Sequence, residues 1–188
     1  MGAGRRAGKH RRRRQAQSMA RGSAAARYRV SRAVRAVCPD ASTPVRSIPH
    51  AVRARIVGRV WDEFGLPVLG FGAVDHPRYR DIGAQSRDTD DFLAWIRRAR
   101  YLVTSDTAAL HIAAGFDVPT TACFTTIAAN LRARDYPRCA CIEFDLPQLQ
   151  GMHASARDVD LAALERAYRA FDWRAMPFAH DASTENLA

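Results

Sequence analysis

The residues best suited to chemistry lie in one short segment, Thr104-Ser105-Asp106-Thr107. It follows an apolar run that ends at Val103 and precedes a helical pattern that reaches Ala114. Its hydroxyls, its carboxylate and the free backbone amides of a helix N-terminus together form a favourable seat for a diphosphate. An equally good explanation is that Asp106 or Thr107 only caps the helix, which contributes about 1 kcal/mol and needs no ligand.

His111 lies four residues after Thr107, so both side chains project from one face of the predicted helix. In that position an imidazole can reach a bound phosphate. A histidine flanked by Leu110 and Ile112 is, however, more often a hydrogen-bonded packing residue, and the spacing does not decide between the two roles.

Two further loops offer groups that can contact a nucleotide. Residues 41–46 supply two hydroxyls and Arg46, whose guanidinium can make a bidentate contact to phosphate. Residues 70–75 contain glycines and end at Asp75, without the spacing of a dinucleotide-binding fingerprint. Asp75 can accept hydrogen bonds from ribose hydroxyls. The simpler alternatives are a solvated arginine and an exposed loop acid.

The elements that hold these loops alternate between strands and helices along the chain. Short apolar runs predict strands, and the stretches between them carry apolar residues at helical spacing. The predicted strands cover residues 36–38, 67–71, 101–103, 120–124 and 140–144. The predicted helices are one that carries Val52 to Phe64 and closes at Gly65, one capped by Thr89, one over residues 107–114 and one capped by Asp160.

This alternation predicts an α/β fold: a Rossmann-like open parallel sheet with helices on both faces. The strands lack a polar/apolar alternation, which is typical of strands that are buried on both sides. In such a sheet, ligands lie beyond the carboxyl ends of the strands. All three loops described above follow predicted strands, so we expect them at that edge.

The positive charge of the chain is confined to its beginning. The net charge is +10, yet residues 1–35 hold 12 Lys and Arg and no acid, and the remainder is nearly neutral. We expect residues 1–27 to be a disordered Arg-rich tail, residues 28–172 to form the Rossmann-like domain, and residues 173–188 to be an irregular C-terminal tail. The first tail can be an anchor for nucleic acid or anionic membrane, a transit-like peptide, or the product of a start codon upstream of Met19.

Composition also excludes several classes of protein. No stretch approaches the roughly 20 apolar residues that cross a membrane, and no secretory signal opens the chain, so we expect a cytoplasmic protein. The four cysteines form no CxxC pair, and the spacing of Cys139 and Cys141 is not that of a zinc site. We therefore predict reduced, structural cysteines and no metal site.

Residues 99–125, ARYLVTSDTAALHIAAGFDVPTTACFT, resemble the signature of family 9 glycosyltransferases, the ADP-heptose:lipopolysaccharide heptosyltransferases. The family pattern is a strand, T-x-D-[ST]-G-x-x-H-x-A-A, then x-x-P and a strand. Upstream, Arg46-Ser47-Ile48-Pro49 is similar to the basic residue that precedes a Trp-Pro pair in the family. The resemblance extends over roughly residues 35 to 145.

The resemblance implies the donor-binding half of a GT-B fold. It implies binding of a nucleotide-diphosphate sugar of the ADP-heptose type, for inverting, metal-independent transfer to a glycan or lipopolysaccharide acceptor without a cofactor. Asp75 is the implied ribose contact. The implied donor and phosphate contacts are Thr43, Arg46, Ser105, Asp106, Thr107, Ala108 and His111.

Three departures from the family pattern lead to an alternative hypothesis, in which the chain is not a complete enzyme. Ala108 replaces a glycine, Ile48 replaces the tryptophan, and the amino-terminal acceptor domain, which carries the proposed catalytic base, is missing. The catalytic residue is therefore unassigned. The chain can bind donor while a domain on another chain binds the lipid-linked or glycan acceptor, or it can be an incomplete or truncated module tethered by its basic tail.

Overall fold

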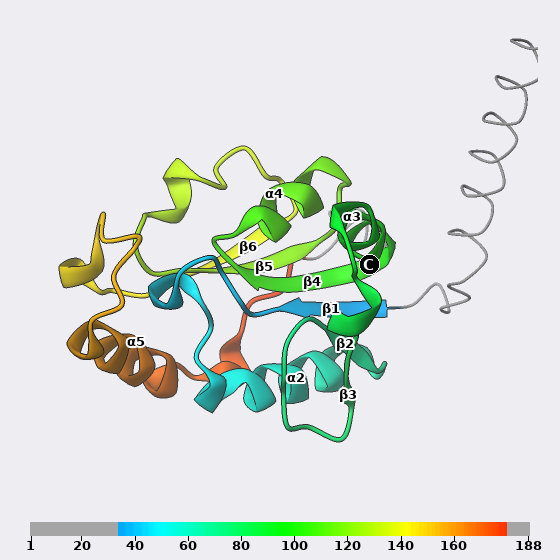
Figure 1. Cartoon of the computed structure of the whole chain (residues 1–188), viewed down its shortest axis with the longest axis horizontal. Coiled ribbons are helices and arrows are strands. Elements are labelled where there is room, and N and C mark those ends of the chain that lie inside the picture. Colours follow the sequence, from blue (N-terminus) through cyan, green and yellow to red (C-terminus); the bar gives the residue numbers. More distant parts are fainter. Residues whose placement is uncertain (1–33, 180–188) are drawn as a thin grey trace, which may run out of the picture. The chain divides into compact units, whose positions relative to one another are not determined.

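Six parallel strands form one open sheet within residues 34–179, which are the residues that the computed structural model describes (Figure 1). The order across the sheet is β3-β2-β1-β4-β5-β6, and every neighbouring pair is parallel. The strands are β1 (Val34–Cys38), β2 (Val68–Gly70), β3 (Tyr79–Asp81), β4 (Ala99–Ser105), β5 (Thr120–Phe124) and β6 (Cys139–Glu143).

Helices cover both faces of this sheet (Figure 1). One face packs against α2 and α5, and the other packs against α3 and α4. In the central strand β4, Val103 belongs to the first of these cores and Leu102 to the second. The helices are α2 (His50–Phe64), α3 (Thr89–Arg98), α4 (Ala108–Gly115) and α5 (Asp158–Ala170).

The predicted α/β fold is thus confirmed. Strand β5 has the predicted bounds, and α2 closes at Gly65, which adopts the left-handed conformation with φ 63°. The caps of two other helices differ from those predicted. Asp88, not Thr89, caps α3 by accepting a hydrogen bond from the amide of Asp91.

Asp160 does not cap α5, which begins two residues before it with Arg157 at the N-cap position. Asp160 is instead buried within the first turn. Its carboxylate accepts hydrogen bonds from Ser155 and from the guanidinium of Arg157. The hydrogen bonds from Arg157 and Ser155 hold the pKa of Asp160 below its usual range.

Strand β3 was not predicted. It is a short edge strand of sequence Tyr-Arg-Asp whose last two residues are exposed. Edge strands with charged residues lack the apolar run by which buried strands are recognised. The sheet therefore extends one strand further than the sequence pattern indicated.

The chain remains packed beyond the predicted domain boundary at residue 172. Trp173–Ala175 form a short 3-10 helix, and both Trp173 and Met176 are buried in the core. Thr121 of β5 donates a hydrogen bond of 2.7 Å to the carbonyl oxygen of Pro177. The predicted tail of residues 1–27, including Met19, lies outside the described residues.

Within residues 34–179 no helix is both long and apolar enough to span a membrane. The same part of the chain has no cluster of three or more His, Cys, Asp or Glu side chains placed to hold a metal ion. Cys38, Cys123, Cys139 and Cys141 are all free thiols.

Candidate functional site

A cleft of about 450 Å³ opens at the carboxyl ends of β1 and β4. These strands are neighbours at the point where the strand order reverses, so the loops that follow them run to opposite faces of the sheet. Such a reversal is where open α/β sheets bind their ligands. The cleft is lined by Cys38, Asp40, Ala41, Ser42, Arg46, Phe92, Asp106, Thr107, Ala108, Ala109, His111 and Arg132.

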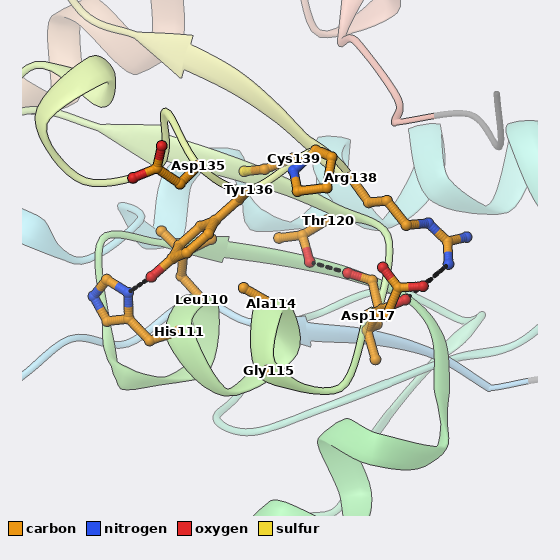
Figure 2. Close-up of a pocket in the computed structure, with 12 residues that line it drawn as sticks. Leu110, His111, Ala114, Gly115, Asp117, Thr120, Asp135, Tyr136, Arg138 and Cys139 are labelled. Atoms are coloured by element: carbon orange, nitrogen blue, oxygen red, sulfur yellow. Dashed lines mark hydrogen bonds and ion pairs between the residues drawn. The ribbon is translucent and has the colours of Figure 1, made fainter.

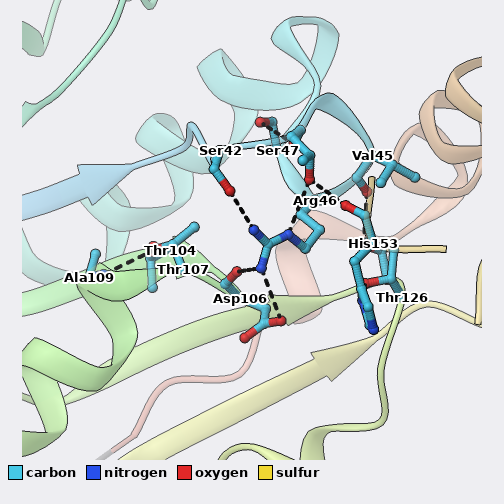
Figure 3. A network of polar contacts seen from close by, with 12 residues as sticks. Ser42, Val45, Arg46, Ser47, Thr104, Asp106, Thr107, Ala109, Thr126 and His153 are labelled. Carbon is cyan, nitrogen blue, oxygen red and sulfur yellow. Dashed lines mark hydrogen bonds and ion pairs between the residues drawn. The ribbon is translucent and has the colours of Figure 1, made fainter. Parts of the chain in front are cut away.

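Arg46 crosses the cleft from the first loop to the second (Figure 3). Its Nη1 donates to the backbone oxygen of Asp106 at 3.3 Å and lies 3.8 Å from the Oδ2 atom of that residue. On its own loop, Nη2 donates to Ser42 at 2.6 Å, and Nε donates to Thr43 at 3.2 Å. The guanidinium is therefore fixed in place before any ligand arrives, which lowers the entropy cost of binding an anion.

The two hydroxyls of this loop have different positions. The hydroxyl of Thr43 donates to the backbone oxygen of His153 at 2.6 Å and accepts the bond from Arg46, and Thr43 does not line the cleft. Thr43 thus orients Arg46. Ser42, which is exposed and lines the cleft, is the hydroxyl placed to meet a ligand.

Asp106 brings a buried carboxylate to the bottom of the cleft. The residue is 4% exposed, and its backbone amide is bonded to Cys123 in the neighbouring strand. Its Oδ2 atom and the hydroxyl of Ser105 have no hydrogen-bond partner among the described residues. A buried oxygen without a donor is unfavourable, so a ligand hydroxyl that donates to Asp106 would relieve this cost. Ser105 is fully buried and does not line the cleft.

Thr107 is the N-cap of α4, which is one of the two roles that the sequence allowed for this loop. Its hydroxyl accepts a bond of 3.2 Å from the amide of Ala109 and lies 3.2 Å from the hydroxyl of Thr104. Capping does not remove this helix end from the cleft, since Thr107, Ala108 and Ala109 all line it. The positive end of the helix dipole thus faces the same space as Arg46.

His111 is exposed rather than packed in the core. It lines the cleft, and its Nδ1 atom lies 2.7 Å from the hydroxyl of Tyr136 (Figure 2). The rings of the two residues meet edge to face with centroids 5.8 Å apart. Tyr136 therefore fixes the direction of the imidazole at the margin of the cleft.

Asp75 is not brought to the cleft. It is exposed, and its loop runs along α2, where the guanidinium of Arg78 lies 4.3 Å from the ring centroid of Trp61. Besides Asp106, the cleft is lined by a second acid, Asp40, which the sequence pattern did not single out. Its Oδ1 atom pairs with the buried guanidinium of Arg53 at 2.5 Å.

Three more lining residues were missed from sequence: Ser42, Phe92 and Arg132. Ser42 is one of the two hydroxyl residues of its loop, and its type and position do not distinguish it from Thr43. Phe92 comes from the core-facing side of α3 and Arg132 from the connection after β5. Nothing in their local sequence distinguishes them from packing or solvated residues.

Comparison with known proteins supports the fold. No protein-family model and no curated protein sequence matches the chain. Among solved structures, the chain is similar to E. coli ADP-heptose lps heptosyltransferase II, with 20% sequence identity and a TM-score of 0.52. The match covers 77% of this chain and 50% of that one, so the chain spans about half the length of its neighbour. In fold, the matched part of the chain is a Rossmann-like domain similar to part of a GT-B heptosyltransferase.

Proposed function

We propose that this cleft binds a nucleoside-diphosphate sugar and that the chain is the donor-binding half of a glycosyltransferase. The observation that carries the proposal is the position of Asp106. A buried carboxylate oxygen without a donor lies next to the fixed guanidinium of Arg46, at the N-terminus of α4 and at the reversal of the strand order.

Each group in the cleft suits one part of such a donor. Arg46 and the first turn of α4 are placed for the diphosphate, whose charge both attract. Asp106 is placed to accept a hydrogen bond from a sugar hydroxyl. Asp40, held by Arg53, replaces Asp75 as the acid that can bind ribose hydroxyls.

The same groups support an inverting transfer. In that reaction an acceptor hydroxyl attacks the anomeric carbon, the bond from that carbon to the phosphate oxygen breaks, and the nucleoside diphosphate leaves with the bonding electrons. Negative charge then grows on the leaving phosphate, where Arg46 and the dipole of α4 stabilise it. The proton of the acceptor hydroxyl passes to a base that we assign to the acceptor-binding half.

The resemblance to a heptosyltransferase favours an ADP-heptose type donor and a glycan or lipid-linked acceptor. Because the chain spans about half of its structural neighbour, we propose that an acceptor-binding domain completes the active site. In that arrangement the described residues supply donor affinity and leaving-group stabilisation, and the acceptor-binding domain supplies the acceptor and the base.

Calorimetric titration of ADP and ADP-heptose into the full chain tests the donor site. We expect both ligands to bind wild type at millimolar concentration or below. ADP-heptose, whose sugar hydroxyl donates to Asp106, should bind about 10- to 100-fold more weakly to Asp106→Asn, because a hydrogen bond to a charged group contributes about 1.5–3 kcal/mol. Asp75→Asn is the matched control and should bind as wild type does. The absence of heat with wild-type protein, or equal losses in the two variants, contradicts the proposal.

A further inference from the structure

A second cavity, of about 570 Å³, lies at the amino ends of the central strands, opposite the donor cleft. Its lining includes the beginnings of β1 and β4 and the turn before β5. Four guanidiniums line it, those of Arg35, Arg97, Arg100 and Arg138, against the single carboxylate of Asp117 among the described lining residues. The folded region is nearly neutral as a whole, yet positively charged side chains gather around this cavity.

Arg35 is the best-placed cation of this group. Its Cζ atom lies 4.3 Å from the ring centroid of Phe64, which holds the guanidinium by a cation–π contact. Its Nε and Nη1 atoms are buried and have no hydrogen-bond partner among the described residues. Burial, and after it the charge of Arg100, lowers the pKa of Arg35. Both the missing acceptors and the repulsion would be relieved by an anion in the cavity.

Asp117, the one acid among the described lining residues, is already paired. Arg138 donates to the carboxylate of Asp117 at 3.0 Å and to its backbone oxygen at 2.9 Å (Figure 2). Arg97 lies 5.6 Å from the ring centroid of Phe116, an exposed aromatic residue at the rim. The carboxylate of Asp117 is thus committed to Arg138 and does not pair with the buried Nε and Nη1 atoms of Arg35.

We propose that this cavity, lined by Arg35, Arg97, Arg100 and Arg138, binds the phosphate group of a small phosphorylated molecule. Planar guanidiniums match the oxygens of phosphate bidentately, and several of them favour a doubly charged anion over a carboxylate. The cavity has the size of a small-molecule site, and Phe64, Tyr101 and Phe116 offer apolar contact to the organic part of the ligand. The site is separate from the donor cleft and independent of it.

The test uses pyrophosphate as the probe, titrated into the full chain at constant ionic strength set with sodium chloride. Backbone amide NMR shifts locate the binding, and calorimetry gives the dissociation constant. We expect shifts at Arg100 and Val118, and a dissociation constant raised about tenfold or more in Arg35→Gln, which removes the charge and keeps a polar side chain. Arg166→Gln, an exposed site on α5, is the control for the loss of one charge.

Arg46→Gln distinguishes binding in this cavity from binding in the donor cleft. This variant should leave the pyrophosphate-induced shifts at Arg100 and Val118 unchanged. If pyrophosphate shifts only residues 106–109, or if Arg166→Gln weakens binding as much as Arg35→Gln, the proposed cavity site is wrong. Because Arg35 is half-buried, the melting temperature of its variant is measured first. Arg97→Gln, at an exposed residue of α3, provides a second variant that removes a lining charge without altering the core.

Discussion

Arg46 and Asp106 join two loops that follow neighbouring strands. The guanidinium of Arg46 bonds to the backbone oxygen of Asp106 at 3.3 Å and lies 3.8 Å from its carboxylate. The side chain of Asp106 is only 6% exposed, and Arg46 is the cation that pairs with it. A ligand that binds between them thus meets a positive group and a hydrogen-bond acceptor already held at a fixed separation.

Arg46→Gln should weaken the binding of ADP by about 10- to 100-fold, because it removes the charge that faces the diphosphate. The melting temperature should fall little, since a partly exposed ion pair contributes about 1 kcal/mol or less. Calorimetry on the full chain measures the first quantity and thermal unfolding the second. Arg55→Gln, at an exposed residue of α2, should bind ADP like wild type. Unchanged affinity in Arg46→Gln would remove this residue from the site.

Gly70→Ala should destabilise the sheet next to the cleft. A Cβ atom at this position meets the backbone oxygen of Val37 in β1 and lies 2.7 Å from the hydroxyl of Tyr79. Because both neighbours belong to the sheet, we expect a loss of about 1–3 kcal/mol in the free energy of unfolding, measured with urea.

Gly115→Ala is the matched control for that change. No atom lies within 4 Å of a Cβ atom placed there, and the residue ends α4. The substitution should be neutral or stabilise by up to about 1 kcal/mol, because alanine loses less backbone entropy in a helix. Equal free energies of unfolding for the two alanine variants would show that β1 and β2 do not approach each other as described.

The sequence was sufficient to predict the architecture, and it placed the loops of Arg46 and Asp106 at one edge of the sheet. The strands are buried on both faces and the helices are amphipathic, so each element leaves a local pattern, and Gly65 marks the end of α2 with a conformation that glycine favours. The meeting of Arg46 with the first turn of α4 followed from the rule that parallel strands end at one edge.

The positions of the other site residues could not be predicted from the sequence, because they depend on the path of irregular segments. Asp75 follows a strand as Asp40 does, yet its loop turns along α2, where His76 lies near Gly58 and Arg78 lies over Trp61. The cavity at the amino ends of the strands could not be predicted for a similar reason. Its arginines come from separate elements, so neither the net charge nor any local run reveals that they converge.

Cys141 should be the most reactive thiol of the described residues. It is exposed on β6, with its Sγ atom 3.8 Å from that of Cys139, and a hydrogen bond from the Cys139 thiol lowers the pKa of Cys141. Burial raises the pKa of both Cys38 and Cys123 to about 12. Iodoacetamide should therefore label Cys141 first in the native protein, as read by peptide mass spectrometry.

The pH dependence of this labelling tests the cause. A lowered pKa means that the Cys141 thiolate forms at lower pH, so the labelling rate rises earlier in a pH series. Cys139→Ala removes the hydrogen-bond donor and should move that rise to higher pH. A rise at the same pH in both proteins would contradict the proposed thiol pair.

The segment after α5 should contribute to stability rather than act as a free tail. Trp173 is 5% exposed, donates from Nε1 to the backbone oxygen of Tyr168 at 2.9 Å, and packs against the ring of Phe171. Trp173→Ala should therefore lower the free energy of unfolding by about 3–5 kcal/mol, as large-to-small changes of buried aromatic residues do. Arg174→Ala, at an exposed residue of the same turn, should change it by less than about 0.5 kcal/mol. Urea unfolding of the full chain measures both, and a loss below about 1 kcal/mol for Trp173→Ala would place the end of the domain before this residue.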